Sequence, residues 1–155
     1  MVLRRMTAAD LDAVLRIEEA SFDAPWSRTS FEGELKKTYG VTRVAEKVGR
    51  VVGYLIEWRI VDEVHIANIA VHPDWRRRGI AQAMMERSLS EAAGCRWVGL
   101  EVRDGNDAAR RLYEKLGFQE RGVRERYYEK EGADAILMVK RLEPLNEGRG
   151  RHGLV

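Results

Sequence analysis

The sequence has little cysteine and no long apolar segment. Cys95 is the one cysteine among 155 residues, so no disulfide can form within the chain, and a reducing, cytoplasmic environment is expected. No apolar run approaches the ~20 residues that a transmembrane helix needs. The N-terminal segment carries Asp10, Asp12 and Glu18 without an uninterrupted apolar core, which argues against a signal peptide.

An excess of charge of one sign is also absent. The chain has 27 Lys and Arg against 25 Asp and Glu, and a formal net charge of +2 is too small to indicate nucleic-acid binding. A composition of 45% hydrophobic and 34% charged residues favours a globular chain with its own core. His65, His72 and His152 lack the spacing of metal ligands, so no metal is expected.

The glycine-rich motifs of nucleotide-binding proteins are missing as well. Neither G-x-x-x-x-G-K-[ST] nor G-x-G-x-x-G occurs, which argues against a P-loop NTPase and a dinucleotide-binding domain. The sequence does contain WRRRGIAQAMM from Trp75 to Met85, where three arginines and a glycine precede a helical pattern. The first turn of a helix offers backbone N–H groups to an anion, and Gly79 removes a Cβ from the path of approach. The alternative is a solvated basic turn.

The first half of the chain reads as strand, two helices and three strands. A short strand from Val2 precedes a helix that Thr7 caps, and a second helix is expected from Ser27 to Lys37. Residues 41–61 read as two strands joined by a tight turn at Gly49–Arg50. A third strand, rich in β-branched and small residues, ends at Pro73.

The second half alternates helices and strands. A helix is expected over 77–93 with Gly94 as its stop, then a strand over 95–102, a short helix over 107–115 ended by Gly117, and a closing hairpin that turns at Glu131–Gly132. The Gly- and Arg-rich residues 143–155 have no periodicity and are expected to be a loose extension. This order predicts an α/β fold in a single domain, residues 1–142, with one mixed sheet flanked by helices.

Five stretches of the sequence resemble one family. Arg76–Ala81 fits R-x-x-G-x-A and resembles the acyl-CoA pyrophosphate loop of the GNAT superfamily of N-acetyltransferases, as do NIAVHPDW before it and LEVRDGNDAARRLYEKLGF after it. DAPWS at 23–27 and RERYYEKEGADAILM at 124–138 resemble its RimI group, the bacterial ribosomal-protein alanine acetyltransferases. The resemblance implies the GNAT fold, a mixed central sheet of about seven strands with about four helices, in which splayed parallel strands form the acyl-CoA cleft. Ala81 departs from the family, since many members have glycine there.

The resemblance also implies roles for single residues, with acetyl-CoA as co-substrate and no metal. Glu101 matches the general base and Tyr113 the general acid. The remaining positions are cofactor-binding (Ile69, Ala70, Val71, Arg77, Arg78, Gly79, Ile80, Ala81, Gln82 and Asn106) or line the acceptor slot (Trp26, Tyr127 and Tyr128).

Acetyl transfer to an amine needs chemistry that these residue types supply. The amine must lose a proton, because an α-amino group has a pKa of ~8. A carboxylate at the end of an apolar strand is suited to accept that proton, and a phenol, which is protonated at neutral pH, can donate one to the leaving thiolate. A backbone N–H near Val71 is expected to stabilise the oxyanion.

A purely structural role remains open for each residue. Glu101 is then a strand-end ion pair, Tyr113 and Trp26 are core side chains, and Asn106 is a helix N-cap. Tyr127 and Tyr128 are then ordinary strand aromatics.

The expected acceptor is the N-terminal α-amine of a protein, most consistent with a small-subunit ribosomal protein that starts with alanine or another small residue. The alternatives are acetylation of lysine side chains or small-molecule amines, and a non-catalytic acyl-CoA-binding module. Neither a membrane nor direct nucleic-acid contact is expected, and the chain is expected to be a monomer or a weak homo-oligomer.

Overall fold

The structure is a computed structural model that describes residues 1–128 and 133–142, and the side chains of 1–124 and 134–142. The expected turn at Glu131–Gly132 and the expected loose extension at 143–155 lie outside the described residues. Tyr127 and Tyr128 are described by their backbone alone.

The described residues form seven strands and four α-helices, as the sequence predicts. The strands make one mixed sheet in the order β1-β2-β3-β4-β5-β7-β6. The elements are β1 (Val2–Arg5), α1 (Leu11–Ser21), α2 (Arg28–Lys36), β2 (Gly40–Lys47), β3 (Arg50–Ile60), β4 (Glu63–Val71), α3 (Ile80–Glu91), β5 (Trp97–Arg103), α4 (Asp107–Lys115), β6 (Gln119–Tyr128) and β7 (Ala133–Arg141). No helix within residues 1–128 and 133–142 combines the length and apolarity that crossing a membrane requires.

The chain divides into two compact units. The N-terminal unit comprises residues 1–59 and 66–87, and the C-terminal unit comprises 60–65 together with the described residues from Ser88 onward. The single domain over 1–142 stays a prediction.

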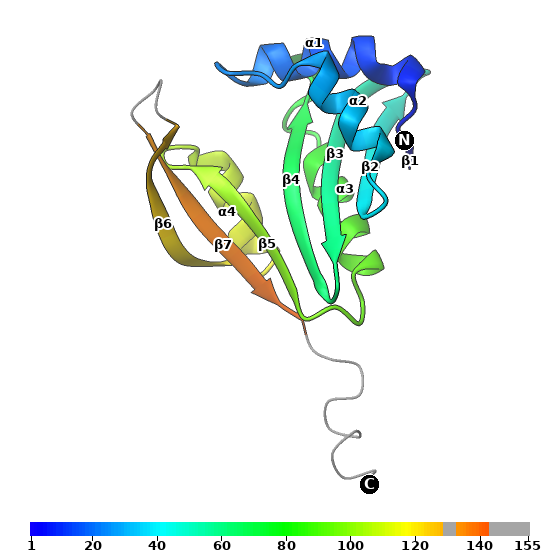
Figure 1. Ribbon diagram of the computed structural model, residues 1–155. Coiled ribbons are helices and arrows are strands. Elements are labelled where there is room, and N and C mark those ends of the chain that lie inside the picture. The colour runs from blue at the N-terminus through cyan, green and yellow to red at the C-terminus, as the bar shows by residue number, and fades with distance from the viewer. Residues whose placement is uncertain (129–132, 143–155) are drawn as a thin grey trace, which may run out of the picture. The chain divides into compact units, whose positions relative to one another are not determined.

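β3 forms the centre of the N-terminal unit because both of its faces are buried. Tyr54 and Ile56 lie on one face in a cluster with buried residues of α1 and α2, such as Phe31. Gly53 lies on the other face, where an added Cβ would come within 3.1 Å of the Met84 side chain on α3. Figure 1 shows α1 and α2 on one side of β3 and α3 on the other. The alternation of a strand therefore places two helical layers on one short segment.

Helix caps fix where α1 and α2 begin. The Asp10 carboxylate accepts a 2.8 Å hydrogen bond from the Thr7 backbone N–H, at a 3-10 turn over Ala8–Asp10 that leads into α1. Ser27 caps α2 through its hydroxyl, which accepts from the Ser30 N–H at 3.1 Å. The cap predicted at Ser27 is confirmed, and Thr7 marks the start of the first helical segment as predicted.

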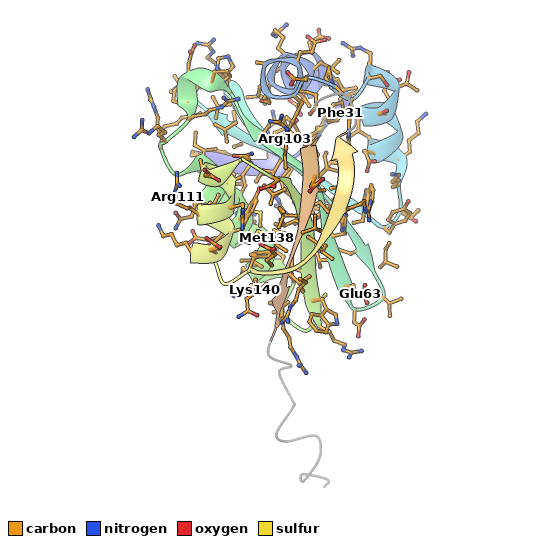
Figure 2. The ribbon with its side chains drawn as sticks, turned by 90° about the vertical axis from the view of Figure 1, so that its left-hand side faces the viewer. Phe31, Glu63, Arg103, Arg111, Met138 and Lys140 are labelled. Carbon is orange, nitrogen blue, oxygen red and sulfur yellow. The ribbon has the colours of Figure 1, made fainter. Side chains whose placement is uncertain are left out.

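The C-terminal unit is an antiparallel ladder of β5, β7 and β6 with α4 on one face. Val98, Leu100 and Val102 are buried on the same face of β5, and Leu100 pairs with Met138 of β7. Lys140, two residues further along β7 (Figure 2), donates from Nζ to the Leu116 carbonyl at the end of α4 at 2.8 Å. The side of the ladder that carries Leu100 and Met138 is therefore the side on which α4 lies.

Three predicted boundaries were wrong. α3 begins at Ile80 rather than Arg77, because Arg77 and Gly79 have φ values of 64° and 78°, which no right-handed helix contains. The β2–β3 turn consists of Val48–Gly49 rather than Gly49–Arg50, since Lys47 pairs with Arg50. The predicted strand at 95–102 is β5 at Trp97–Arg103.

Candidate functional site

The basic run lies in the turn that leads from β4 into α3. A short 3-10 turn at Pro73–Trp75 is followed by Arg77 and Gly79 in the left-handed region. In the first turn of α3 the Ala83 N–H donates to the Gly79 carbonyl at 3.0 Å. By helix geometry the amides of Ile80 and Ala81 precede that bond and point out of the helix start, where the helix dipole favours an anion.

The conformation of Gly79, rather than its small size, is what the turn requires. An added Cβ on Gly79 would meet no protein atom within 4 Å, so packing against the rest of the chain does not require a glycine here. A φ of 78° instead disfavours any side chain. That Gly79 leaves room for an approaching anion stays a prediction. Arg77 adopts φ 64° although it carries a side chain, and such local strain is common at functional sites.

The arginines of the run have different environments. Arg76 donates from Nε to the Val71 carbonyl at 2.9 Å and from Nη2 to the Ser21 hydroxyl at 3.0 Å, so it joins the end of β4 to the end of α1. The Arg78 guanidinium lies 4.9 Å from the centre of the Trp75 ring. Arg77 and Arg78 are exposed, so they supply the positive charge around the helix start while Arg76 fixes the turn.

The predicted pantetheine strand is the last part of β4. Ala70 and Val71 are buried and Ile69 is half-buried. Ala70 belongs to the core cluster that includes Tyr54 and Phe31. The backbone of this segment is therefore held firmly by the core of the N-terminal unit.

Glu101 forms an ion pair across the ladder of the C-terminal unit. It is opposite Leu137 on β7, and its carboxylate lies 3.5 Å from the guanidinium of Arg124 on β6. The register of β6 shifts between Glu120 and Gly122, and this shift puts Arg124 opposite Ala135, on the Glu101 face. Without the shift Arg124 would face the other side, because one residue of slip inverts every side chain of a strand.

His65, which lacks the sequence spacing of a metal ligand, belongs to the same cluster as Glu101 and Arg124. Burial lowers the pKa of the His65 imidazole below its usual value, the nearby Glu101 charge opposes that change, and the Arg124 charge adds to it. His65 is half-buried near the start of β4 and belongs to the C-terminal unit. No spacing motif joins His65 to Glu101, so the sequence alone offered no signal for this cluster.

Tyr113 lies on the other face of the same ladder. It is 7% exposed on α4 and packs edge-on against Phe118, with ring centroids 6.0 Å apart. Since α4 covers the Leu100 face, Tyr113 and Glu101 start from opposite faces of β5. A substrate can contact both side chains only if it lies beside an edge of β5.

Asn106 and Trp26 both make the contacts that their structural roles require. Asn106 caps α4 by accepting from the Ala109 N–H at 3.3 Å. Trp26 packs on the core, with its ring centroid 5.3 Å from that of Phe31. Their assignments to cofactor and acceptor remain predictions, as do those of Tyr127 and Tyr128, whose side chains lie outside the described part.

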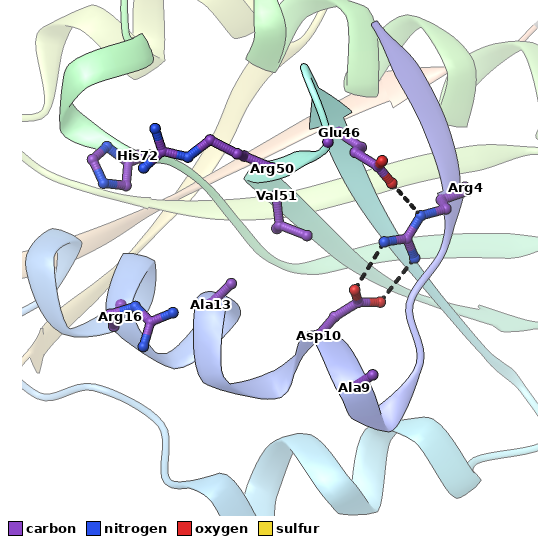
Figure 3. A pocket seen from close by; sticks show the side chains of 10 residues that line it. Arg4, Ala9, Asp10, Ala13, Arg16, Glu46, Arg50, Val51 and His72 are labelled. Atoms are coloured by element: carbon purple, nitrogen blue, oxygen red, sulfur yellow. Dashed lines mark hydrogen bonds and ion pairs between the residues drawn. The ribbon is translucent and has the colours of Figure 1, made fainter.

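A separate hollow of about 390 Å³ lies beside α1, and none of the predicted site residues lines it. Arg4 lies at one end of it and donates hydrogen bonds to Asp10 and Glu46, while Arg16, Arg50 and His72 lie toward the other end (Figure 3). The side chains described in 1–124 and 134–142 include no cluster of three His, Cys, Asp or Glu that could hold a metal ion.

The described elements define the class of protein as an α/β protein with one mixed seven-stranded sheet flanked by helices. Residues 11–118 match the Acetyltransferase (GNAT) family, and the chain belongs to this family. It is an acetyltransferase, and the resemblance drawn from the sequence motifs is confirmed.

Individual relatives agree with this assignment along most of the chain. A protein of Bacillus subtilis strain 168 is 37% identical over 139 residues, which are 88% of this chain and 92% of the relative. The [ribosomal protein bS18]-alanine N-acetyltransferase of Escherichia coli K12 is 34% identical over 138 residues, 86% of this chain and 93% of the relative. The crystal structure of the Escherichia coli ribosomal-protein-S18-alanine N-acetyltransferase has a TM-score of 0.87 at 32% identity and covers 95% of this chain and 97% of that chain.

The cluster around His65 can be tested by its own titration. We expect an NMR titration to give His65 a pKa below 6.5. Glu101→Gln removes the opposing charge and should lower it further, whereas Arg124→Gln should raise it. The neutral form is favoured in the folded protein, so the His65 contribution lowers stability as the pH falls below 6.5.

Arg111→Gln is the control, because Arg111 is exposed on α4 (Figure 2), the helix on the opposite face of the ladder. A His65 titration that responds to neither Glu101→Gln nor Arg124→Gln would show that the three side chains do not act on one another.

Proposed function

We propose that this acetyltransferase moves the acetyl group of acetyl-CoA to the N-terminal α-amine of a small-subunit ribosomal protein that begins with alanine or another small residue. The observation that carries the proposal is the likeness, over 86% of the chain, to an Escherichia coli enzyme whose name gives the alanine of bS18 as its acceptor. The cytoplasm, where ribosomal proteins are made, is the proposed location.

The start of α3 fits the diphosphate of coenzyme A. The amides of the first helical turn, the left-handed Gly79 and the exposed Arg77 and Arg78 together offer backbone donors and positive charge. We assign Arg77–Gln82 to the diphosphate and the backbone of Ile69, Ala70 and Val71 to the pantetheine arm. Asn106 retains its capping bond in this proposal, and because that bond uses the side-chain oxygen, the side-chain NH₂ can donate to the cofactor.

The transfer step uses Glu101 and Tyr113 as base and acid. The acceptor nitrogen gives a proton to the Glu101 carboxylate and attacks the thioester carbonyl, and a backbone N–H near Val71 stabilises the oxyanion. The carbon–sulfur bond then breaks, and the departing thiolate takes the Tyr113 phenol proton. The second proton of the acceptor nitrogen leaves as the amide forms and returns to the Tyr113 phenolate, which restores the phenol. Because the two groups start from opposite faces of β5, this step requires the thioester to lie beside an edge of β5.

The connection between α1 and α2 is the proposed wall of the acceptor slot. Trp26 is half-buried, so its ring has one side on the core and part of its surface available to a ligand. A bulky wall favours a small first residue. Tyr127 and Tyr128 are proposed for the opposite wall on the strength of the sequence resemblance alone.

Gly79→Val should weaken acetyl-CoA binding by ~1–3 kcal/mol, because a β-branched residue resists φ 78° and distorts the turn that presents the amides. Isothermal titration calorimetry with acetyl-CoA measures the change. Gly33→Ala is the control, since Gly33 lies within α2, has open space around it and has no positive φ. Wild-type affinity in Gly79→Val would remove this turn from the cofactor site.

Glu101→Gln and Tyr113→Phe should each leave the fold intact and lower kcat by ~10²–10⁴-fold, the usual contribution of a general base or acid. Tyr113→Phe keeps the ring that packs on Phe118. Glu114→Gln, an exposed change on α4, serves as the control and should keep full turnover. Either catalytic variant with wild-type turnover across pH would be left with a structural role only.

The acceptor class is decided by matched peptides. The peptides of one set begin with alanine and have a free α-amine. Those of the other set have a blocked α-amine and an internal lysine. We expect kcat/KM to favour the free α-amine, because a slot that holds the backbone beside the first residue positions that amine and not a distant lysine. Equal rates would make the chain a side-chain acetyltransferase, and acetyl-CoA binding without turnover on any amine would make it a binding module.

A further inference from the structure

Glu18 is a charged residue at a position where the helical pattern calls for an apolar one. It shares the buried face of α1 with Val14 and Ile17, and it is 1% exposed. Removing a carboxylate from water costs several kcal/mol unless hydrogen bonds replace the lost water. Within the described part of the chain Glu18 has no cationic partner, so neutral donors satisfy its charge.

Three donors from three segments meet at this carboxylate. The Trp26 backbone N–H donates to Oε2 at 2.8 Å, the Asn68 side-chain amide donates to Oε1 at 2.8 Å, and the Tyr54 hydroxyl donates to the same Oε1. Burial raises the pKa of Tyr54, and the Glu18 charge raises it further, so the phenol keeps the proton that it donates. The carboxylate therefore joins the α1–α2 connection to β3 and β4.

We propose that Glu18 is a positioning residue for acceptor selection, because its carboxylate holds the backbone of Trp26, and with it the segment 22–27, against β3 and β4. The proposal rests on the proposed function, in which Trp26 forms a wall of the acceptor slot. It adds a residue that touches neither acceptor nor cofactor, and that acts through the place it gives to Trp26.

The segment 22–27 has few other backbone anchors. Phe22 donates to the Glu18 carbonyl at 3.0 Å, which ends α1, and Ser27 begins the cap of α2. Between them Pro25 has no N–H, and residues 22–25 are exposed. The Trp26 N–H bond to Glu18 is thus the tie between the middle of this segment and the core, while the indole ring rests on Phe31.

Glu18→Gln separates this tie from the rest of the network. A glutamine has one acceptor oxygen and one donor NH₂. Its oxygen is best placed where two donors, Tyr54 and Asn68, already point, which turns its NH₂ toward the Trp26 N–H. Two donors then face each other, so the Trp26 amide loses its partner while the side chain keeps its shape and its bonds to β3 and β4.

Glu34→Gln is a matched control on the neighbouring helix. Glu34 is also buried, at 6% exposure, and it also accepts from an aromatic side chain, the Trp58 Nε1 at 2.8 Å. Its other partner is the Lys37 ammonium at 2.7 Å, and none of these groups belongs to segment 22–27. This variant loses a buried carboxylate without releasing Trp26.

Two measurements are made on wild type, Glu18→Gln and Glu34→Gln at a temperature where all three are folded. The first is hydrogen exchange of the Trp26 amide, which should speed up at least about tenfold in Glu18→Gln and stay unchanged in Glu34→Gln. The second is the kcat/KM for a peptide that begins with alanine divided by the kcat/KM for a matched peptide that begins with leucine. That ratio should fall at least about fivefold in Glu18→Gln, mainly through KM, and stay within about twofold in Glu34→Gln.

Each other outcome overturns the proposal. Unchanged Trp26 exchange removes the tie, and faster exchange with an unchanged peptide ratio removes its role in selection. Equal losses of selectivity in both variants indicate general softening of the core. Should Glu18→Gln not fold, Glu18→Asp, which keeps the charge but draws it back by one methylene, is measured in the same way. A wild-type protein that acetylates neither peptide contradicts the proposed function instead, and the amide-exchange result still decides the tie.

Discussion

The burial of β3 on both faces is the constraint on which the N-terminal unit depends. A strand covered on one side by α1 and α2 and on the other by α3 must bury side chains of suitable size on both faces, as Tyr54, Leu55 and Ile56 do. Tyr54 supplies bulk toward α1 and α2, and Gly53 admits Met84 and the Ala70 carbonyl on the opposite side. Glu18 near the end of α1 accepts a hydrogen bond from Tyr54, and Ile80 at the start of α3 lies close to Gly53. The end of α1 and the start of α3 are therefore held by adjacent residues of β3.

The charged side chains of this protein differ in the partners that surround them. Arg76, Arg77 and Arg78 are all exposed, but the guanidinium of Arg76 is held by hydrogen bonds to the Val71 carbonyl and the Ser21 hydroxyl. Glu101 faces Arg124, whereas Glu18 has only neutral donors among the side chains and backbone that the structure describes. An arginine partner places a positive charge beside a carboxylate, whereas a network of neutral donors holds the carboxylate in one orientation. The surroundings of the two carboxylates therefore suit different roles, a proposed general base for Glu101 and a positioning residue for Glu18.

Periodicity was sufficient to predict the class and order of the elements, because α1, β3 and β5 bury regular sets of apolar residues. It failed where single residues adopt unusual backbone geometry. No sequence pattern indicates that the backbone of Arg77 adopts the left-handed region. The start of α3 was therefore placed three residues early. The register shift beside Gly122 is equally silent in the sequence, and the Glu101–Arg124 pair could not be predicted without it. Glu18 was hidden for a different reason, since a glutamate in a helix is normally assigned to the solvated face.

The aromatic contacts around Trp26 have a consequence for how such an enzyme changes over evolutionary time. The ring of Trp26 lies 5.3 Å from that of Phe31, and Phe31 lies 5.7 Å from the fully buried Tyr54. Tyr54 in turn shares the Glu18 carboxylate with the Trp26 backbone. A substitution in the exposed segment 22–27 is therefore transmitted to the centre of the core, where mutational tolerance is lowest. Lineages that alter this segment should accumulate compensating changes at positions 18, 31 and 54. These positions are distant in sequence but should therefore change together.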